Sequence, residues 1–282
     1  MIAIDIACAQ IQGARDGQED CAAVWPGPAT FTPVNELPTA LPDTILAVLA
    51  DGMGGHAAGD IAARIACEAF IASYAESVAK ASASPKAGET PGDAACEAAD
   101  GVRAIRLAAA AEHANVGLAN AVATEPALKG MGTTLIGALF SEHGLEWVSI
   151  GDSPLYLIRD GELALLNEDH SLAPALDQLV AEGRLTAERA RNDPRRHMLR
   201  SAVNGERIEL IDISRKALAL SAGDIIVAAS DGLDTLQRDE IARIVTGYAS
   251  DGAEAITGAL LRAVENAREA YQDNTTVITA KL

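Results

Sequence analysis

Short apolar runs, separated by turns that contain glycine, proline or acidic residues, recur along most of the chain. Runs of four to eight aliphatic residues bounded in this way are typical of buried β-strands. The strands that this pattern predicts are 2–11, 21–25, 44–50, 134–140, 145–150, 155–158, 162–166, 224–230 and 273–280. The runs between 134 and 166 are joined by short turns, so we expect antiparallel neighbours in one meander.

Apolar positions spaced three or four residues apart predict helices elsewhere. The predicted helices are 57–79, 102–123, 239–245 and one from about 253. Residues 26–43 hold five prolines, and residues 80–100 are small, polar and broken by proline and glycine, so both are predicted surface loops. Residues 168–207 are charged and mixed, which indicates an irregular or short-helical excursion.

Several predicted strands, such as 44–50 and 224–230, are apolar at consecutive positions and therefore on both faces. In an antiparallel sheet, this means that both faces are covered, by a second sheet or by helices. Two antiparallel sheets packed face to face, with amphipathic helices outside them, satisfy this requirement. We predict an α+β four-layer sandwich in a single domain over residues 1–282, since the sequence has no internal repeat and no second-domain boundary.

The composition narrows the class of protein. The chain has 282 residues, 49% of them hydrophobic, and a formal net charge of −18. This acidity argues against binding to nucleic acid, which depends on Lys and Arg, and would attract divalent cations. Cys8, Cys21, Cys67 and Cys96 have no zinc-like spacing, which indicates isolated thiols in a reducing cytosol. Without a signal-peptide pattern or a span-length apolar run, we expect a soluble cytoplasmic protein with no membrane contact.

Acidic residues stand at the edges of the predicted strands. Asp51 closes the run 44–50 and begins the sequence Asp-Gly-Met-Gly-Gly-His. The other acids at such positions are Asp20, Asp152, Asp231 and Asp273. Asp-Gly is a common turn dipeptide, so each acid alone is more simply explained as a solvated turn residue. Five such acids can meet at one rim of a sandwich, where carboxylates and a backbone carbonyl suit a hard divalent cation. The set therefore predicts a cation site.

Seven motifs surround these acids. They are Arg15-x-x-x-Glu19-Asp20, Asp51-Gly-Met-Gly-Gly-His-x-x-Gly59, Gly130-Met-Gly-Thr-Thr134, Ile150-Gly-Asp-Ser153, Asp169-His-Ser171, Ser230-Asp-Gly232 and Asp273-Asn274. In this order, over nearly the whole chain, they resemble the metal-dependent serine/threonine protein phosphatases of type 2C in their bacterial form. Each motif alone is weak, whereas the series in register is highly specific. The fold of that family resembles the one that the patterning predicts: two central antiparallel sheets flanked by helices.

The resemblance implies a centre of two divalent ions, Mn²⁺ or Mg²⁺, with a third ion in some bacterial members. Asp51 would bridge both ions. Asp231 and Asp273 would complete the shell of one ion, and the carbonyl of Gly52 would bind the other. Asp20 would act on that second ion through a bound water.

Further roles follow from the same resemblance. Arg15 would grip the substrate phosphate, because its planar fork matches two phosphate oxygens. His56 would donate a proton to the leaving alkoxide. Glu19, Asn274 and Asp152 would support the site, and Asp152 would order its turn rather than bind metal. Two ions roughly 3.5–4 Å apart would lower the pKa of a shared water and neutralise phosphoryl charge during in-line attack.

The chain departs from the family pattern at a few positions. Pro154 stands where many members carry Arg, and Gln18 replaces the usual Asn. Near the segment where an extra acid would hold a third ion, Lys129 is present and Glu125 is the nearest upstream acid, so no third site is assigned. Residues 168–207 correspond to the flap of the family, which could contact the substrate protein or form a solvated lid.

We therefore predict a protein serine/threonine phosphatase that hydrolyses phosphoserine and phosphothreonine by direct attack of a water or hydroxide bridging two metals. Its partners would be phosphorylated proteins, and it would oppose a bacterial-type serine/threonine kinase in signalling, as a monomer. The alternative is a non-catalytic phosphatase-like binding module, although such proteins usually lose one or more metal acids. A two-metal hydrolase of another phosphoester would share the acids but not the full motif series.

Overall fold

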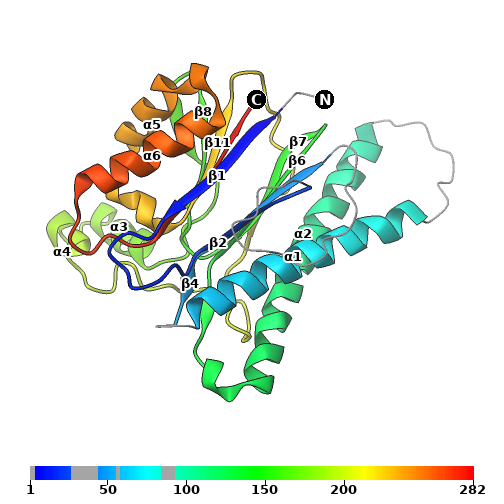
Figure 1. The fold of residues 1–282 in the computed structure, drawn as a ribbon, viewed down its shortest axis with the longest axis horizontal. Helices are drawn as coiled ribbons and strands as arrows, with labels where there is room; N and C mark the ends of the chain where they lie inside the picture. Colours follow the sequence, from blue (N-terminus) through cyan, green and yellow to red (C-terminus); the bar gives the residue numbers. More distant parts are fainter. Residues whose placement is uncertain (1–3, 27–43, 55–57, 84–92) are drawn as a thin grey trace.

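Two five-stranded antiparallel sheets lie face to face in the computed structural model of the chain, with helices on both outer faces (Figure 1). The structure describes residues 4–26, 44–54, 58–83 and 93–282, and of 82–83 and 93–100 only the backbone. Sheet I has the strand order β1 (Asp5–Ile11), β12 (Thr275–Lys281), β11 (Ile225–Ala229), β8 (Leu155–Arg159) and β9 (Glu162–Leu165). Sheet II has the order β10 (Asp212–Ile213), β7 (Gly144–Ile150), β6 (Leu135–Ser141), β3 (Ile45–Ala50) and β2 (Cys21–Trp25). The predicted α+β sandwich is confirmed.

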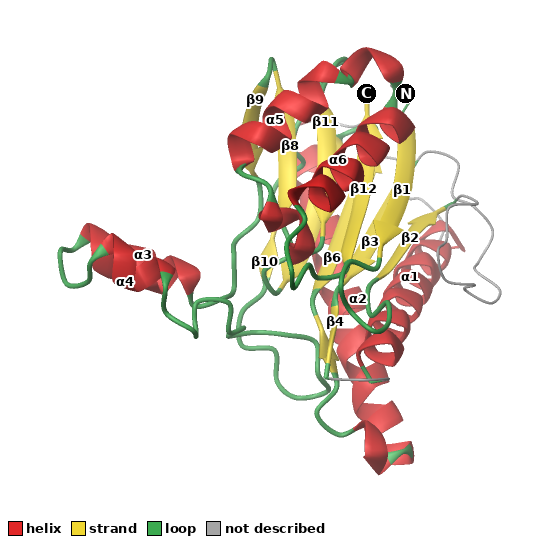
Figure 2. Ribbon diagram, turned by 60° about the vertical axis from the view of Figure 1, so that its left-hand side comes forward, coloured by secondary structure: helices red, strands yellow, loops and turns green. Residues whose placement is uncertain are grey.

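Helices complete the four layers. The long pair α1 (Gly59–Ala83) and α2 (Asp93–Thr124) packs on sheet II, and α5 (Arg238–Gly247) and α6 (Ala253–Ala267) pack on sheet I. Two short helices, α3 (Ala173–Ala181) and α4 (Ala187–Arg191), project from this body (Figure 2). The remaining elements are the two-stranded ladder of β4 (Gly52–Met53) and β5 (Gly132–Thr133), and the 3-10 helices η1 (Pro126–Leu128), η2 (Asp231–Thr235) and η3 (Ala249–Asp251).

Alternation along the central strands explains why they are apolar on both faces. In β3, Leu46 and Val48 pack toward α1 and α2, whereas Ala47 and Leu49 pack toward sheet I. Strand β11 divides its residues in the same way between sheet II and the outer helices. Because successive side chains of a strand point to opposite faces, a strand in the middle of four layers is buried on both faces, which explains the consecutive apolar residues of β3 and β11.

The structure corrects the predicted loop at 80–100. Helix α1 continues to Ala83 and helix α2 already begins at Asp93, so both ends of that range are helical. Alanine, the best helix former, is frequent at these ends, whereas the prolines of the stretch stand at 85 and 91. Residues 84–92, and all but the first residue of the predicted loop at 26–43, lie outside the described residues.

The predicted meander between 134 and 166 is wrong at its middle. β6 pairs with β7, and β8 pairs with β9, but β7 belongs to sheet II and β8 pairs with β11 in sheet I. The turn at 151–154 therefore carries the chain from one sheet to the other. At its start, Gly151 has φ +104, and a Cβ there would lie 2.6 Å from the Thr134 side chain, so glycine allows this crossing.

Three of the four cysteines lie within the packed layers, and no disulfide joins them. Cys21 and Cys67 are buried and Cys8 is partly buried, and burial raises the pKa of the Cys8 thiol to about 12. The predicted isolation does not hold for one pair, because Cys67 Sγ donates to the Cys21 carbonyl at 3.6 Å. The side chain of Cys96 lies outside the described residues. None of the helices in the described ranges combines the length and the apolar character needed to cross a membrane.

The contact between α1 and sheet II gives a test of this packing. A Cβ on Gly137 in β6 would lie 2.4 Å from the ring of Phe70, so Gly137→Ala forces the ring to move. We expect a loss of about 1–3 kcal/mol in the free energy of unfolding, measured by urea titration. Gly101→Ala, where a helical Cβ meets nothing within 4 Å, is the control and should leave stability unchanged or raise it. Equal stabilities of the two variants would contradict the packing.

Candidate metal centre

Four of the predicted acids lie at the end of the sandwich opposite the two chain termini. Asp20 directly precedes β2 and Asp51 directly follows β3, and these strands are antiparallel partners with Cys21 opposite Ala50. Asp231 follows β11 and Asp273 precedes β12, which are also antiparallel partners. In an antiparallel pair, the end of one strand meets the start of the other. Strand pairing therefore places one pair of acids on each sheet, at the same end of the molecule.

Asp20 joins the two sheets. One of its carboxylate oxygens, Oδ2, accepts hydrogen bonds from Ser230 Oγ at 2.8 Å and Thr276 Oγ1 at 2.7 Å, where β11 ends and β12 begins in sheet I. Asp20 is only 7% exposed, and its other oxygen, Oδ1, is buried without a hydrogen-bond partner among the described atoms. A buried carboxylate oxygen without a donor is costly, and a cation would satisfy it.

Electrostatic coupling shows that the four acids share one site. Burial and the nearby charges of Asp231 and Asp273 raise the pKa of Asp20 to about 6, although its two hydroxyl donors act in the opposite direction. Burial, followed by the charge of Asp20 and then Asp231, raises the pKa of Asp51 well above its ordinary value. The pKa of Asp231 is raised by burial and by Asp273. Asp20, Asp51 and Asp231 thus each hold a proton more tightly than an exposed aspartate does.

Hydrogen bonds with Thr133 in β5 and with the next residue, Thr134, fix the backbone of Asp51. Its carbonyl accepts from Thr133 Oγ1 at 2.8 Å and from the Thr134 amide at 2.9 Å, and its own amide donates to Thr134 Oγ1 at 3.0 Å. The next residue, Gly52, is buried in β4, where a Cβ would lie 2.2 Å from the carbonyl oxygen of Gly59. Only glycine fits at this position, directly after Asp51.

Arg15 lies in the loop after β1 and forms an ion pair with Asp273. The pKa of the Arg15 guanidinium is raised by its hydrogen bond to Asp273 and by the charge of Asp231, which places Arg15 beside two of the acids. Asn274 secures the loop, because its amide nitrogen donates to the carbonyls of Gln12 at 2.8 Å and Gly17 at 2.9 Å. The side chain of Arg15 remains 59% exposed, so it can still meet a ligand from solvent.

The supporting residues surround this arrangement. The amide of Glu19 donates to Asn274 Oδ1 at 2.8 Å, and its carboxylate lies against the start of α1, since a Cβ on Gly59 would be 2.4 Å from Glu19 Oε2. Asp152 lies in the turn between the sheets, where burial and the charges of Asp231 and Asp169 raise its pKa to about 7. His56 lies outside the described residues.

Sequence reasoning missed the hydroxyl groups that hold the acids. Thr134 bonds Ser153 Oγ at 2.7 Å as well as the Asp51 amide, and Ser230 and Thr276 orient Asp20. Thr134 and Ser230 stood inside recognised motifs, which was a usable signal. Thr276 lay outside every motif, and a threonine within a strand pattern gives no sign of a contact with Asp20 until the pairing of the strands is known.

The donor set suits a hard divalent cation. Within the described ranges, no three His, Cys, Asp or Glu side chains form a ready-made group around an ion. The fit depends instead on the chemistry of the site. Asp20, Asp51 and Asp231 have raised pKa values, and Asp20 Oδ1 is buried without a partner among the described atoms. All four acids offer carboxylate oxygens as donors. Oxygen donors of this kind prefer Mg²⁺, Mn²⁺ or Ca²⁺ to softer metals.

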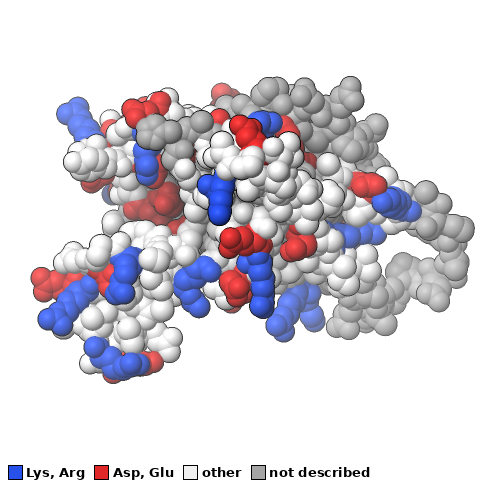
Figure 3. All heavy atoms as spheres, turned by 90° about the horizontal axis from the view of Figure 1, so that it is seen from below, with Lys and Arg blue, Asp and Glu red and all other residues white. Residues whose placement is uncertain are grey.

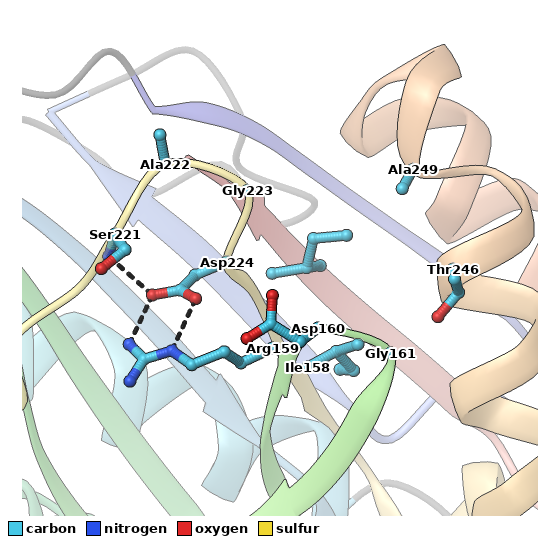
Figure 4. A pocket seen from close by; sticks show the side chains of 11 residues that line it. Ile158, Arg159, Asp160, Gly161, Ser221, Ala222, Gly223, Asp224, Thr246 and Ala249 are labelled. Atoms are coloured by element: carbon cyan, nitrogen blue, oxygen red, sulfur yellow. Dashed lines mark hydrogen bonds and ion pairs between the residues drawn. The ribbon is translucent and has the colours of Figure 1, made fainter.

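A separate hollow lies at the far end of the same strands (Figure 4). It has a volume of about 320 Å³ and is lined in part by Arg159, Asp160 and Asp224, where β8 ends and β11 begins. Arg159 is already bound there, with Nε 2.8 Å from Asp224 Oδ1 (Figure 4). The hollow therefore has no part in the acid site, which lies at the other end of both strands.

Comparisons with known proteins agree with this architecture. A family model described as Protein phosphatase 2C matches residues 40–266. The chain is 38% identical over 195 residues to the serine/threonine protein phosphatase PstP of Mycobacterium tuberculosis, an alignment that covers 69% of this chain and 33% of that protein. The chain thus spans about a third of the length of this relative.

Solved structures are similar over nearly their whole length. A crystal structure of M. tuberculosis PstP/Ppp has a TM-score of 0.69 and 30% identity, covering 99% of this chain and 98% of that chain. The catalytic domain of PstP in complex with two manganese ions has a TM-score of 0.65 and 30% identity, covering 99% and 97%. Both likenesses cover 99% of this chain.

The raised pKa of Asp20 predicts how the stability of the metal-free protein depends on pH. A folded-state pKa near 6, above the unfolded value of about 3.9, means that the folded state holds the proton more tightly. This contribution is complete below about pH 4 and is lost as pH rises through 6. The difference in unfolding free energy between wild type and Asp20→Asn should therefore fall by about 1–3 kcal/mol between pH 4 and pH 7.5.

Urea unfolding of both proteins in metal-free buffer measures this difference. The wild type loses stability with rising pH at the Asp20 carboxylate, whereas the amide of the variant does not titrate. A difference that stays constant, or grows with pH, would show that Asp20 is not held among like charges.

Proposed function

The chain belongs to the protein phosphatase 2C family, and on this basis we propose that it is a protein serine/threonine phosphatase acting on phosphoserine and phosphothreonine. The observation that carries the proposal is the coupling of Asp20, Asp51, Asp231 and Asp273 at one end of the sandwich, beside an exposed arginine. Hydrolysis of a dianionic phosphoester requires carboxylates that hold divalent cations and a positively charged side chain that binds the phosphate.

We propose Mn²⁺ or Mg²⁺ as the cofactor, held by Asp51, Asp231, Asp273 and the Gly52 carbonyl, with Asp20 acting through water. A similar protein, the PstP catalytic domain, has been solved with two manganese ions, which supports a divalent cofactor. When bound, the ions would supply an activated water at neutral pH and positive charge for the phosphoryl oxygens. No third ion is proposed.

The residues of the chain have separate tasks in this proposal. Ser230 and Thr276 hold Asp20 in one orientation, so its free oxygen faces a fixed direction. Arg15, now paired with Asp273, has a planar guanidinium with donors left for phosphate oxygens. Loop anchoring by Asn274 keeps that guanidinium at the acids. His56 is proposed as the donor of the proton that the departing alkoxide needs.

The wider setting is also proposed. Phosphorylated proteins are the substrates, a bacterial-type serine/threonine kinase is the opposing enzyme, and the protein acts as a cytoplasmic monomer in one domain. The formal net charge of −18 supports the absence of nucleic-acid binding.

Metal-dependent turnover tests this function directly. With Mn²⁺, the wild type should hydrolyse p-nitrophenyl phosphate and a phosphothreonine peptide, and chelation should abolish both. Asp231→Asn should lower kcat by roughly 100-fold or more, the scale on which removal of a single transition-state stabilising group acts. Arg15→Ala should mainly raise KM for the peptide, because Arg15 contributes to phosphate binding.

The control is Asp239→Asn, an exposed acid in the first turn of α5, which should remain fully active. Metal binding without turnover in the wild type would instead support a non-catalytic binding module. Equal activity of wild type and Asp231→Asn would contradict the proposed centre.

A further inference from the structure

The projecting segment carries charge opposite to that of the rest of the chain. Residues 184–200, here called the basic arm, contain six arginines and only two acids. The arginines are Arg184, Arg189, Arg191, Arg195, Arg196 and Arg200. The arm therefore has a net charge of four positive in a protein whose formal net charge is −18. Such a concentration of one sign on one projection marks an interaction surface.

Half of these arginines have no carboxylate partner in the described part of the chain. Arg184, Arg195 and Arg196 are paired with Glu182, Asp193 and Asp177 respectively. Arg189, Arg191 and Arg200 are exposed, and no ion pair is formed by any of them within the described residues. A partner that brings carboxylates to these three would displace no internal ion pair.

The C-terminal end of the basic arm is joined to the turn beside the acid site. Ser171 and Leu199 form a β-bridge at this base of the arm, where the Arg200 amide donates to the His170 carbonyl at 2.8 Å. The His170 amide in turn donates to the carbonyl of Gly151, beside Asp152, at 3.0 Å. Thr134, which accepts from the Asp51 amide at 3.0 Å, also bonds Ser153 in the same turn at 2.7 Å. Hydrogen bonds thus connect the base of the arm, through the 151–154 turn, to the backbone of Asp51.

From this base the arm extends away from the body. Figure 2 shows α3 and α4 as a projection beside the sandwich. In Figure 3, basic side chains gather over the lobe at the lower left, and acidic side chains lie in the recess between that lobe and the rest of the molecule. A polypeptide with its phosphate at the acids could therefore lay its flanking residues along the basic arm.

We propose that the basic arm binds acidic residues that flank the phosphorylated side chain of a protein substrate. This inference rests on the proposed phosphatase function and specifies its substrate class: phosphoserine or phosphothreonine in a segment rich in Asp and Glu. The acidic body would repel such a segment, so the arm is the surface that admits it. Paired guanidinium and carboxylate groups supply the recognition.

A protein segment fits better than a nucleic acid. Residues 168–207 contain no Phe, Tyr or Trp, the side chains on which unstacked bases rest. The acids Glu188 and Asp193 are interspersed among the arginines and would oppose a continuous phosphate backbone. A peptide can place its separate carboxylates at the arginines and avoid Glu188 and Asp193.

Peptide turnover with matched flanks tests the inference. The substrates are three phosphothreonine peptides that differ only in three flanking positions, filled with Asp, Ala or Lys. With Mn²⁺ at low salt, kcat/KM should be higher for the Asp peptide than for the Ala peptide by about tenfold, since each exposed ion pair contributes modestly. The advantage should shrink as ionic strength rises, and the Lys peptide should be the poorest substrate.

The variants separate the basic arm from the rest of the surface. Arg189→Glu combined with Arg191→Glu should bring the Asp-to-Ala ratio to one or below, with turnover of p-nitrophenyl phosphate unchanged. Arg243→Glu combined with Arg262→Glu makes the same charge change at exposed positions on α5 and α6 and should keep the preference. For the neutral double variant Arg189→Gln with Arg191→Gln, the Asp-to-Ala ratio of kcat/KM should lie between the ratios of these two variants.

Three results would overturn the proposal. They are the absence of an acidic preference in wild type, a preference that survives in the arm variant, and stronger binding of a single-stranded oligonucleotide than of the Asp peptide. If p-nitrophenyl phosphate is not hydrolysed, the phosphatase function itself fails. Fluorescence anisotropy of the labelled Asp peptide then still decides whether the arm binds it, because the arm variant should lose that binding and the α5–α6 variant should not.

Discussion

Burial of like charges at one end of the sandwich is the constraint on which the account depends. Burial and neighbouring carboxylates raise the pKa values of Asp20, Asp51 and Asp231, so the fold carries a local cost that its core must offset. Such a cost persists where the charges serve a purpose, because ordinary turn residues would be free to move apart. A divalent cation reverses the sign of the interaction: it turns mutual repulsion into shared attraction.

The rigidity of the two sheets makes this constraint useful. Asp51 and Asp231 follow β3 and β11, strands that are apolar and buried on both faces, so the backbone at these acids cannot relax without disturbing the core. Asp20, which precedes β2 of sheet II, is hydrogen-bonded to Ser230 and Thr276 of sheet I. Asn274 holds the loop that carries Arg15. The projecting segment has the opposite character: it is charged, lies outside the packed layers and is suited to meeting partners.

The sequence predicted the sheets and the positions of the acids because both follow from local patterns. Apolar runs identify strands, and antiparallel pairing then brings acids such as Asp51 and Asp231 to one rim. The sheet switch at Gly151 was not predictable in this way, since β7 and β8 carry similar runs and a short turn serves a hairpin or a crossing equally well. The role of Thr276 depends on cross-sheet register, which no local pattern encodes. Residues 80–83 and 93–100 were predicted as loop because the nearby Pro85 and Pro91 indicated a break in the helix.

Anomalous diffraction from crystals grown with Mn²⁺ tests the proposal that these acids jointly hold divalent cations. We expect two anomalous peaks that share Asp51, one of them also contacting Asp231 and Asp273 and the other the Gly52 carbonyl. Peaks that lie elsewhere on the protein, or the absence of any peak among these acids at saturating Mn²⁺, would contradict it.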